Sequence, residues 1–438
     1  MNFTIDFKPN APTKFKIEKN NFIFNTLPLK IKNIPDQNQI IENSLNHPIG
    51  TNRIENMLKP GMDLVILVDD ITRPTPSSKI LPHLIERIKA TGISDTHIKI
   101  IIAPGTHRPM TEKELEIKLG RQILNRNIVL NRDYRETSKF EYLGKTKSGI
   151  PIDVDSEVYN ADFVIGIGTI SPHISAGWSG GAKIILPGIC SARTTDMMHY
   201  TACIAQPVLE ILGSNDNAPR KEMEEIAEKV GLNFIINTVL DEKDNILGIF
   251  SGHYIHAHQK GTELADKLFC VPIPQKADIL IVSANPCHFD YWQGIKPYAY
   301  SHRAIRKGGV LIFLLDGEEH LCGDAPSHEF TLKKYMLWDF KDMKTEVEKG
   351  RATDIVGMNV PMYHATLRHR TTNFIVTNHL KKDEIDILGF EYKKNVQVAL
   401  DHAFKLLGKD AKVGIIPYGG KTLTKVDSED FKKIEKNC

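Results

Sequence analysis

The feature that most constrains the fold is a repeated order of apolar run, polar loop and amphipathic segment. Residues 63–69, 98–103 and 163–170 are rich in Ile, Val and Leu and are typical of buried strands. The first run is followed by a proline-containing loop and a predicted helix over residues 79–90, and residues 111–114 form a capping box that opens another helix. This alternation predicts an α/β fold with mainly parallel, helix-covered sheets.

A second region of the same character begins near residue 273. Residues 271–276 contain two prolines and are typical of a linker, and alternating residues before position 55 predict a small amino-terminal sheet that leads into a helix. We therefore expect two α/β domains, over residues 1–272 and 273–438, that enclose an active-site cleft. The strands expected in the second domain cover residues 278–284, 309–315, 373–377 and 412–417.

The charge balance and the cysteine spacing exclude several classes of protein. The chain of 438 residues has 56 Lys and Arg against 54 Asp and Glu, a formal charge of +2, so we expect neither a nucleic-acid nor a membrane partner. There is no signal-peptide pattern, and no apolar run approaches the roughly 18 residues that span a bilayer. We expect a cytoplasmic protein whose six cysteines are reduced thiols, since none forms a Cys-x-x-Cys pair.

Polar loops follow all three strands of the first domain. Ligands bind at the carboxyl ends of parallel strands, so we expect Arg73, His107, His173 and Lys183 to share one site. Arg73 stands between two prolines and offers a rigid fork of donors to a carboxylate or phosphate. His107 follows a Gly-Thr pair and is either a general acid or base or a structural histidine bonded to a carbonyl.

The glycine-rich stretch over residues 177–183 is compared with a phosphate-binding P-loop, but the match fails. That motif needs Gly before the lysine and Ser or Thr after it, where this chain has Ala182 and Ile184. The glycines still allow an anion to approach the backbone at a helix start, and Lys183 is placed to contact or bond a ligand. His199 is a possible metal ligand, but one histidine is a poor metal site, so spacing leaves its role open.

A second group of histidines, His253, His256 and His258, precedes a predicted helix. A metal-binding tract is one reading of this group. Solvated or helix-capping histidines are the interpretation that we favour.

Together these motifs resemble the nickel-dependent lactate racemase family. The match spans both expected domains and rests on residues 69–76, 103–109, 171–183 and 185–189, on His199, and on the pair Gln293 and Lys296. The resemblance implies a nickel-pincer nucleotide, a thiolated pyridinium mononucleotide bonded covalently to Lys183. It further implies that His199 is the one protein ligand of nickel, and that cofactor-synthesis proteins act on this chain.

The resemblance also implies an activity and residue roles. The activity is racemisation or epimerisation of a small 2-hydroxy acid by hydride transfer, with His107 and His173 as the acid/base pair. The substrate would be held by Arg73, Gln293 and Lys296, and the cofactor would contact Asp70, Thr72, Ser179, Gly180, Gly181 and Trp292.

Hydride transfer suits these residue types. The carbinol hydrogen of a 2-hydroxy acid is too weakly acidic for an imidazole, since the carboxylate is already anionic and each pKa unit of mismatch costs about 1.4 kcal/mol. Hydride transfer avoids the carbanion and forms a planar 2-keto acid. Two histidines then serve the two orientations of the hydroxyl group.

The chain departs from the family pattern around the substrate residues. Many relatives have a Pro-x-Asp turn where this chain has Asn285 to His288, and Tyr291 and Trp292 precede the glutamine. These side chains, with Trp178, are expected to reshape the pocket. Lactate, malate, larger aliphatic or aromatic 2-hydroxy acids and sugar acids all remain candidate substrates.

Two other classes of protein stay open. One is a pyridoxal-phosphate enzyme with a Schiff base at Lys183 and its phosphate on Arg73. The other is a non-catalytic nucleotide- or metal-binding module on a racemase-like scaffold. The sequence does not specify an oligomeric state.

Overall fold

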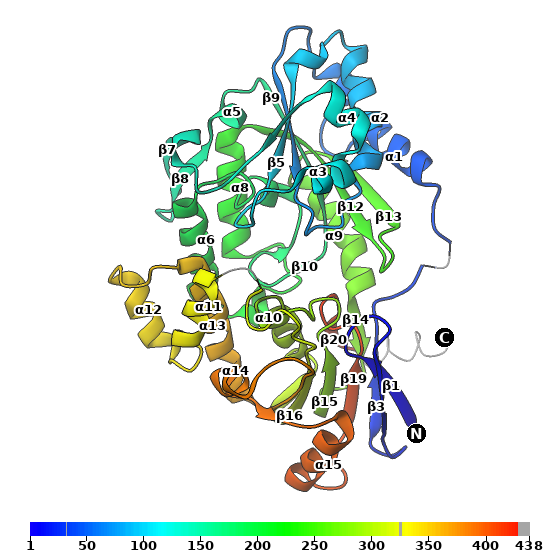
Figure 1. Cartoon of the computed structure of the whole chain (residues 1–438). Helices are drawn as coiled ribbons and strands as arrows, with labels where there is room; N and C mark the ends of the chain where they lie inside the picture. The colour runs from blue at the N-terminus through cyan, green and yellow to red at the C-terminus, as the bar shows by residue number, and fades with distance from the viewer. Residues whose placement is uncertain (32, 324–325, 428–438) are drawn as a thin grey trace.

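Two six-stranded sheets form the centres of the upper and lower halves of the computed structural model in Figure 1, which describes residues 1–31, 33–323 and 326–427. The first sheet has the order β13-β12-β9-β4-β5-β6, and only β13 runs antiparallel to its neighbour. Its strands are β4 (Leu64–Asp69), β5 (Ile98–Ala103), β6 (Ile128–Asn131), β9 (Phe163–Thr169), β12 (Leu232–Leu240) and β13 (Ile246–Gly252).

The three predicted strands β4, β5 and β9 are adjacent in this sheet, which confirms the expected repeat. Val68 on β4 pairs with Ile102 on β5 and with Ile167 on β9, so the three carboxyl ends lie at one edge. Almost every residue of these strands is buried, as the apolar runs require. The longer helices of this half are α1 (Gln37–Asn46), α2 (Ser77–Ala90), α3 (Glu112–Leu119), α6 (Ala192–Ile204), α8 (Ala218–Val230) and α9 (His256–Phe269), and the shorter ones are α4 (Arg121–Arg126), α5 (Ser156–Tyr159) and α7 (Val208–Ile211).

The second sheet has the order β18-β17-β16-β15-β19-β3 and is parallel throughout. Its strands are β15 (Ala277–Ser283), β16 (Ile305–Leu314), β17 (Thr371–Val376), β18 (Glu391–Tyr392), β19 (Val413–Ile416) and β3 (Phe22–Asn25). The four strands that the sequence predicts here are confirmed. The helices are α10 (Tyr291–Ser301), α11 (Pro326–Tyr335), α12 (Phe340–Glu348), α13 (Ile355–Leu367), α14 (Lys382–Leu388) and α15 (Val396–Leu407).

The amino terminus corrects the expected division at residue 272. The hairpin of β1 (Asn2–Asp6) and β2 (Pro12–Lys16) packs its buried side chains against the core of the second sheet, and β3 pairs with β19 in that sheet. Figure 1 shows β1 and β3 beside β19, far from the first sheet. The alternating pattern predicts strands correctly, but their partner lies almost 400 residues away and leaves no local signal.

The predicted linker over residues 271–276 is also corrected. Cys270–Ile273 form strand β14, which pairs in parallel with β20 (Leu423–Val426). Two-stranded pairing at an edge tolerates proline, so the prolines that indicated a linker do not prevent a strand.

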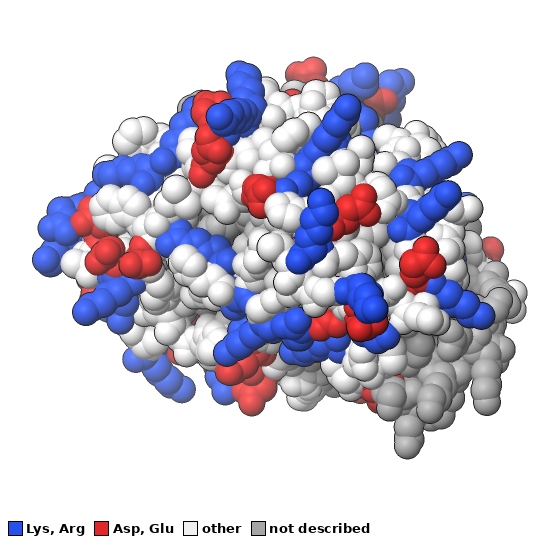
Figure 2. Space-filling view, turned by 90° about the horizontal axis from the view of Figure 1, so that it is seen from below, with Lys and Arg blue, Asp and Glu red and all other residues white. Residues whose placement is uncertain are grey.

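The surface seen in Figure 2 carries charges of both signs, and the described cysteines are free. On the face seen in Figure 2, Lys and Arg side chains are interspersed with Asp and Glu. Within the described residues, none of the helices has the length and apolar character that crossing a membrane requires. The five described cysteines carry free thiols, and Cys438 lies outside the described residues.

Candidate active site

One cavity lies between the two halves, at the carboxyl ends of β4, β5 and β9 and against helices α10 and α13. It holds about 1070 Å³ of empty space, part of it open to solvent. The predicted convergence of remote loops is therefore confirmed. The predicted residues that line the cavity are Asp70, Arg73, His107, His173, Ser179, Gly180, Lys183, His199, Trp292, Gln293 and Lys296. Thr72 and Gly181 are not among the lining residues and contact those that are.

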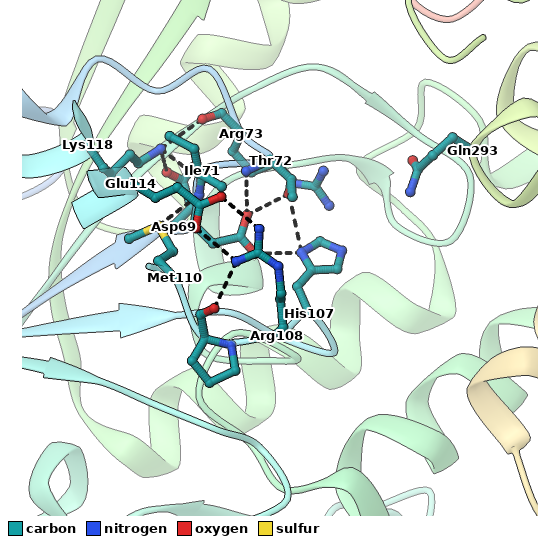
Figure 3. Close-up of polar contacts among 12 residues, drawn as sticks. Asp69, Ile71, Thr72, Arg73, His107, Arg108, Met110, Glu114, Lys118 and Gln293 are labelled. Atoms are coloured by element: carbon teal, nitrogen blue, oxygen red, sulfur yellow. Dashed lines mark hydrogen bonds and ion pairs between the residues drawn. The ribbon is translucent and has the colours of Figure 1, made fainter. Parts of the chain in front are cut away.

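Asp70 and Thr72 orient His107. The Asp70 Oδ2 atom lies 2.5 Å from His107 Nδ1, and its Oδ1 accepts hydrogen bonds from the Thr72 N–H at 2.9 Å and hydroxyl at 2.5 Å (Figure 3). Burial favours the neutral acid, but the bond from His107 and the charge of Arg73 outweigh it and hold the pKa of Asp70 well below its usual range. A carboxylate accepts only, so Nδ1 of His107 carries the hydrogen and Nε2 has the lone pair.

His107 is neutral near neutral pH. Burial lowers its pKa, and the positive charges of Arg73 and Lys296 lower it further. The Asp70 carboxylate opposes this shift and stabilises the imidazolium once a proton has been accepted.

His173 presents the opposite tautomer. It ends the short strand β10 (Pro172–His173), and its Nδ1 accepts the backbone N–H of Ser175 at 3.2 Å. In the neutral ring the hydrogen is therefore on Nε2. Burial and the nearby charge of Lys183 hold the pKa of His173 well below 6.5, so it is also neutral near neutral pH.

The Gly180–Gly181 turn places Lys183 by close packing against β12. Both glycines have positive φ, 77° and 61°, and a Cβ at Gly180 would lie 2.7 Å from Asn237 Oδ1. The Gly181 N–H donates to that same oxygen at 2.7 Å. The turn opens a 3-10 helix of only four residues, Gly181–Ile184, which carries Lys183. These glycines therefore allow the turn to pack closely against β12. From the sequence we expected them only to let an anion approach the backbone.

His258 supports this turn from behind. Its ring is 2% exposed, and Nε2 lies 2.9 Å from the carbonyl oxygen of Ser179. A Cβ at Gly181 would meet the His258 ring at 2.8 Å. His258 is thus a buried structural histidine. The solvated or helix-capping role that we favoured from the sequence is wrong for this residue.

Lys183 has an unusual protonation equilibrium. Burial and the positive charges of Arg73, Lys296 and Arg220 lower its pKa from 10.5 to about 7. A large fraction of the amine is then neutral near pH 7, which is the nucleophilic form of a lysine side chain.

His199 presents one free ring nitrogen. Its Nδ1 lies 2.9 Å from the Thr195 carbonyl oxygen and must donate, so the lone pair is on Nε2. Burial lowers its pKa to about 4, which keeps that lone pair available. Across the interdomain contact, Nδ2 of Asn359 on α13 donates to the His199 carbonyl oxygen at 3.3 Å.

The second half contributes Gln293 and Lys296 of α10 to the cavity lining. Asp290 caps this helix by accepting the Gln293 N–H at 2.6 Å, and Lys296 Nζ donates to Gln293 Oε1 at 2.5 Å. The amide NH2 of Gln293 is then its remaining donor. Figure 3 shows Gln293 across from Arg73 and His107.

Three residues that matter here were not singled out from the sequence. Asn237 and Asn359 line the cavity. Each is a polar residue within an otherwise apolar strand or helix, and this pattern could have identified them from the sequence. Lys118 lies behind the site with its side chain 3% exposed, and nothing in its helical segment distinguishes it from a surface lysine.

Comparison with known proteins gives consistent matches. The family model of the lactate racemase N-terminal domain matches residues 10–211, and that of the C-terminal domain matches residues 273–423. A lactate racemase from Lactiplantibacillus plantarum is 30% identical over 391 residues, which cover 87% of this chain and 90% of that protein. A lactate racemase from Thermoanaerobacterium thermosaccharolyticum is 28% identical over 386 residues, 87% of this chain and 89% of that protein.

Solved structures agree. The lactate racemase apoprotein from T. thermosaccharolyticum superimposes with a TM-score of 0.85 at 27% identity, over 97% of this chain and all of the other. A protein from Thermotoga maritima, 20% identical over 91% of this chain, has a TM-score of 0.66, which shows the fold alone.

The fold and the interdomain cavity define an isomerase of the racemase class. More specifically, the chain belongs to the lactate racemase family. The expected family and fold class are confirmed.

Proposed function

We propose that this protein inverts the C2 hydroxyl centre of a small 2-hydroxy acid. One observation carries the proposal. The same cavity contains two neutral histidines, His107 and His173, that hold their ring hydrogen on different nitrogens, and two cationic side chains, Arg73 and Lys296, that come from opposite domains. The cofactor, the mechanism and the residue roles below are parts of this proposal.

Arg73 and Lys296 bind the substrate carboxylate. Both line the cavity, and Arg73 comes from the first half while Lys296 comes from α10 of the second. The carboxylate therefore lies between the domains, and the Gln293 NH2 group is free to orient it or the hydroxyl oxygen.

The histidines move the hydroxyl proton. Nε2 of His107 accepts the proton from O2 of one enantiomer, and Asp70 stabilises the resulting imidazolium. His173 faces O2 of the other enantiomer. Its neutral ring carries the hydrogen on Nε2, so it accepts the O2 proton only after that hydrogen has moved to Nδ1, which requires the Ser175 N–H contact to open. Inversion transfers one proton from O2 to one histidine and one proton from the other histidine to O2, and solvent, to which the cavity is partly open, restores both rings.

Lys183 and His199 fit a nickel-pincer nucleotide. Lys183 supplies a buried amine with a pKa of about 7 for the covalent bond, and His199 offers one free imidazole nitrogen. No group of three or more His, Cys, Asp and Glu within the described residues suits a metal ion, so the other nickel ligands would come from the bound nucleotide. When bound, this group supplies the acceptor and donor of the C2 hydrogen as hydride.

The remaining predicted residues would shape the nucleotide site. Cofactor-synthesis proteins would deliver the group. The side chains or backbone proposed to contact it directly are Asp70, Ser179, Gly180 and Trp292, with Thr72 and Gly181 supporting them.

Three measurements test the proposal. The chain, co-expressed with cofactor-synthesis enzymes, should show an added mass at Lys183, about one nickel per chain, and interconversion of a 2-hydroxy acid by chiral chromatography. Lys183→Ala should lose the added mass, whereas His199→Ala should retain it and lose mainly the metal. A borohydride-trapped pyridoxyl-lysine would instead favour a Schiff-base enzyme, and a retained ligand with no stereochemical exchange would favour a binding module.

A further inference from the structure

Part of the cavity wall formed by the second half is apolar. It consists of Trp292 and Ile295 on α10 and Val356 and Val360 on α13, and Ile174 of the first half also lines the cavity. The carboxylate-binding side chain Lys296 is on the same helix as Trp292, one turn away. A substrate held by Lys296 therefore has its C2 substituent near this wall.

Trp292 is held in place by two residues of other helices. Its indole stacks on the His328 ring of α11, with centroids 4.2 Å apart and planes at 14°. His328 Nδ1 lies 2.7 Å from Asp354 Oδ2, and the side chains of both are 13% exposed. Asp354 also caps α13 by accepting the Gly357 N–H at 2.7 Å. The indole is thus connected to the same helix that carries the two valines.

The cationic side chains near this wall and the Asn359 NH2 group are already engaged. Among the described residues lining the cavity, the Lys and Arg side chains are Arg73, Lys183 and Lys296. Lys183 is the proposed covalent attachment point, and the other two hold the first carboxylate. The Asn359 amide donates to the His199 carbonyl oxygen and to Cys203 Sγ at 3.1 Å. A second carboxylate, or a chain of hydroxyl groups, would lose water here without gaining matched partners.

We propose that Trp292, positioned by His328 and Asp354, forms with Val356 and Val360 a fixed wall that selects 2-hydroxy acids with an uncharged apolar side chain. This inference rests on the proposed function and specifies its substrate class. His328 and Asp354 are positioning residues, since they act through the indole and do not line the cavity.

A substrate panel tests the selectivity. The loaded protein should interconvert at least one of lactate, 2-hydroxybutanoate and 2-hydroxy-3-methylbutanoate with a kcat/KM at least about tenfold above those for malate and gluconate. Equal or faster interconversion of malate or gluconate would overturn the inference and leave the proposed function standing. Interconversion of none of the five acids would overturn the proposed function itself.

Variants test the positioning role. Trp292→Ala and His328→Ala should each lower kcat/KM for 2-hydroxy-3-methylbutanoate relative to lactate by about tenfold, mainly through KM. His328→Phe keeps an aromatic ring against the indole and should recover most of this ratio. Trp338→Ala is the matched control, because Trp338 is 38% exposed and does not line the cavity.

Calorimetric binding of 2-hydroxy-3-methylbutanoate to the same loaded proteins gives a second readout. The dissociation constant should rise in His328→Ala, with nickel content and the circular dichroism spectrum equal to those of the wild type. An unchanged substrate ratio and dissociation constant in both His328→Ala and Trp292→Ala would show that the wall does not contact the substrate.

Discussion

Asp70 Oδ2 lies 2.5 Å from Nδ1 of His107, and this contact determines which imidazole nitrogen is free to act as a base. The proposed acid/base role of His107 depends on this tautomer as well as on the position of the ring. The same cavity holds His173 in the other tautomer, because there a backbone N–H points at Nδ1.

The first prediction follows from that contact. Asp70→Asn can donate to Nδ1 of His107 and so move the ring hydrogen to Nε2, which removes the base. We expect kcat of the loaded enzyme to fall by about 100- to 10 000-fold with a smaller change in KM. Steady-state kinetics with a chiral assay measure this, with Asp216→Asn as a control at a carboxyl that is 85% exposed. Wild-type kcat in Asp70→Asn would contradict the role of His107 as a base.

The second prediction concerns pH. His107 must be neutral to accept a proton, and burial lowers its pKa below 6.5. Activity should therefore be full at pH 7 and decline only as the pH falls through that lowered pKa, below 6.5. Because Asp70 raises the pKa of His107 against the effect of burial, the residual activity of Asp70→Asn should decline at a still lower pH. A profile of log kcat/KM from pH 4 to 9 measures both; an acid limb above pH 6.5 would contradict the assignment.

The third prediction concerns Lys183. With a pKa of about 7, its amine should react with an acylating reagent with a pH midpoint near 7 in the cofactor-free protein, as measured by peptide mass spectrometry. Arg73→Gln removes one of the positive charges that disfavour the ammonium, so the midpoint should rise. The exposed Lys30, 70% exposed in its side chain, is the internal control. A midpoint near 10 in the wild type would contradict the prediction.

The fourth prediction concerns Lys118, which supports the loop that carries Arg73. Its Nζ lies 2.6 Å from Asp69 Oδ1 and donates to the carbonyl oxygens of Asp70 at 3.0 Å and Arg73 at 2.8 Å (Figure 3). Lys118→Met leaves a largely buried carboxylate without its cation, so we expect a loss of about 3–5 kcal/mol in unfolding free energy. Urea denaturation measures it. The double variant Lys118→Met/Asp69→Asn should recover part of the loss, and equal stability of the two variants would exclude the ion pair as the cause.

Much of the site follows from one property of the sequence. Apolar runs predict β4, β5 and β9, and parallel pairing brings the loops after them to one edge, so Arg73, His107 and Lys183 are brought together by local patterns alone. Three features were not predicted. They are the pairing of β3 with β19, the pairing of β14 with β20, and the support of the glycine turn by His258. Each depends on a contact between segments far apart in the chain, for which hydrophobic periodicity carries no signal.

The sequence by itself determined the α/β class, the carboxyl-edge location of the site and the residue types in it, because strand periodicity and loop composition are local properties. Only the tertiary structure decided which nitrogen of His107, His173 and His199 is free, and that the Lys183 amine has a pKa of about 7. Tautomers and pKa values depend on burial and on charges from separate loops and both domains, which meet only when the chain has folded.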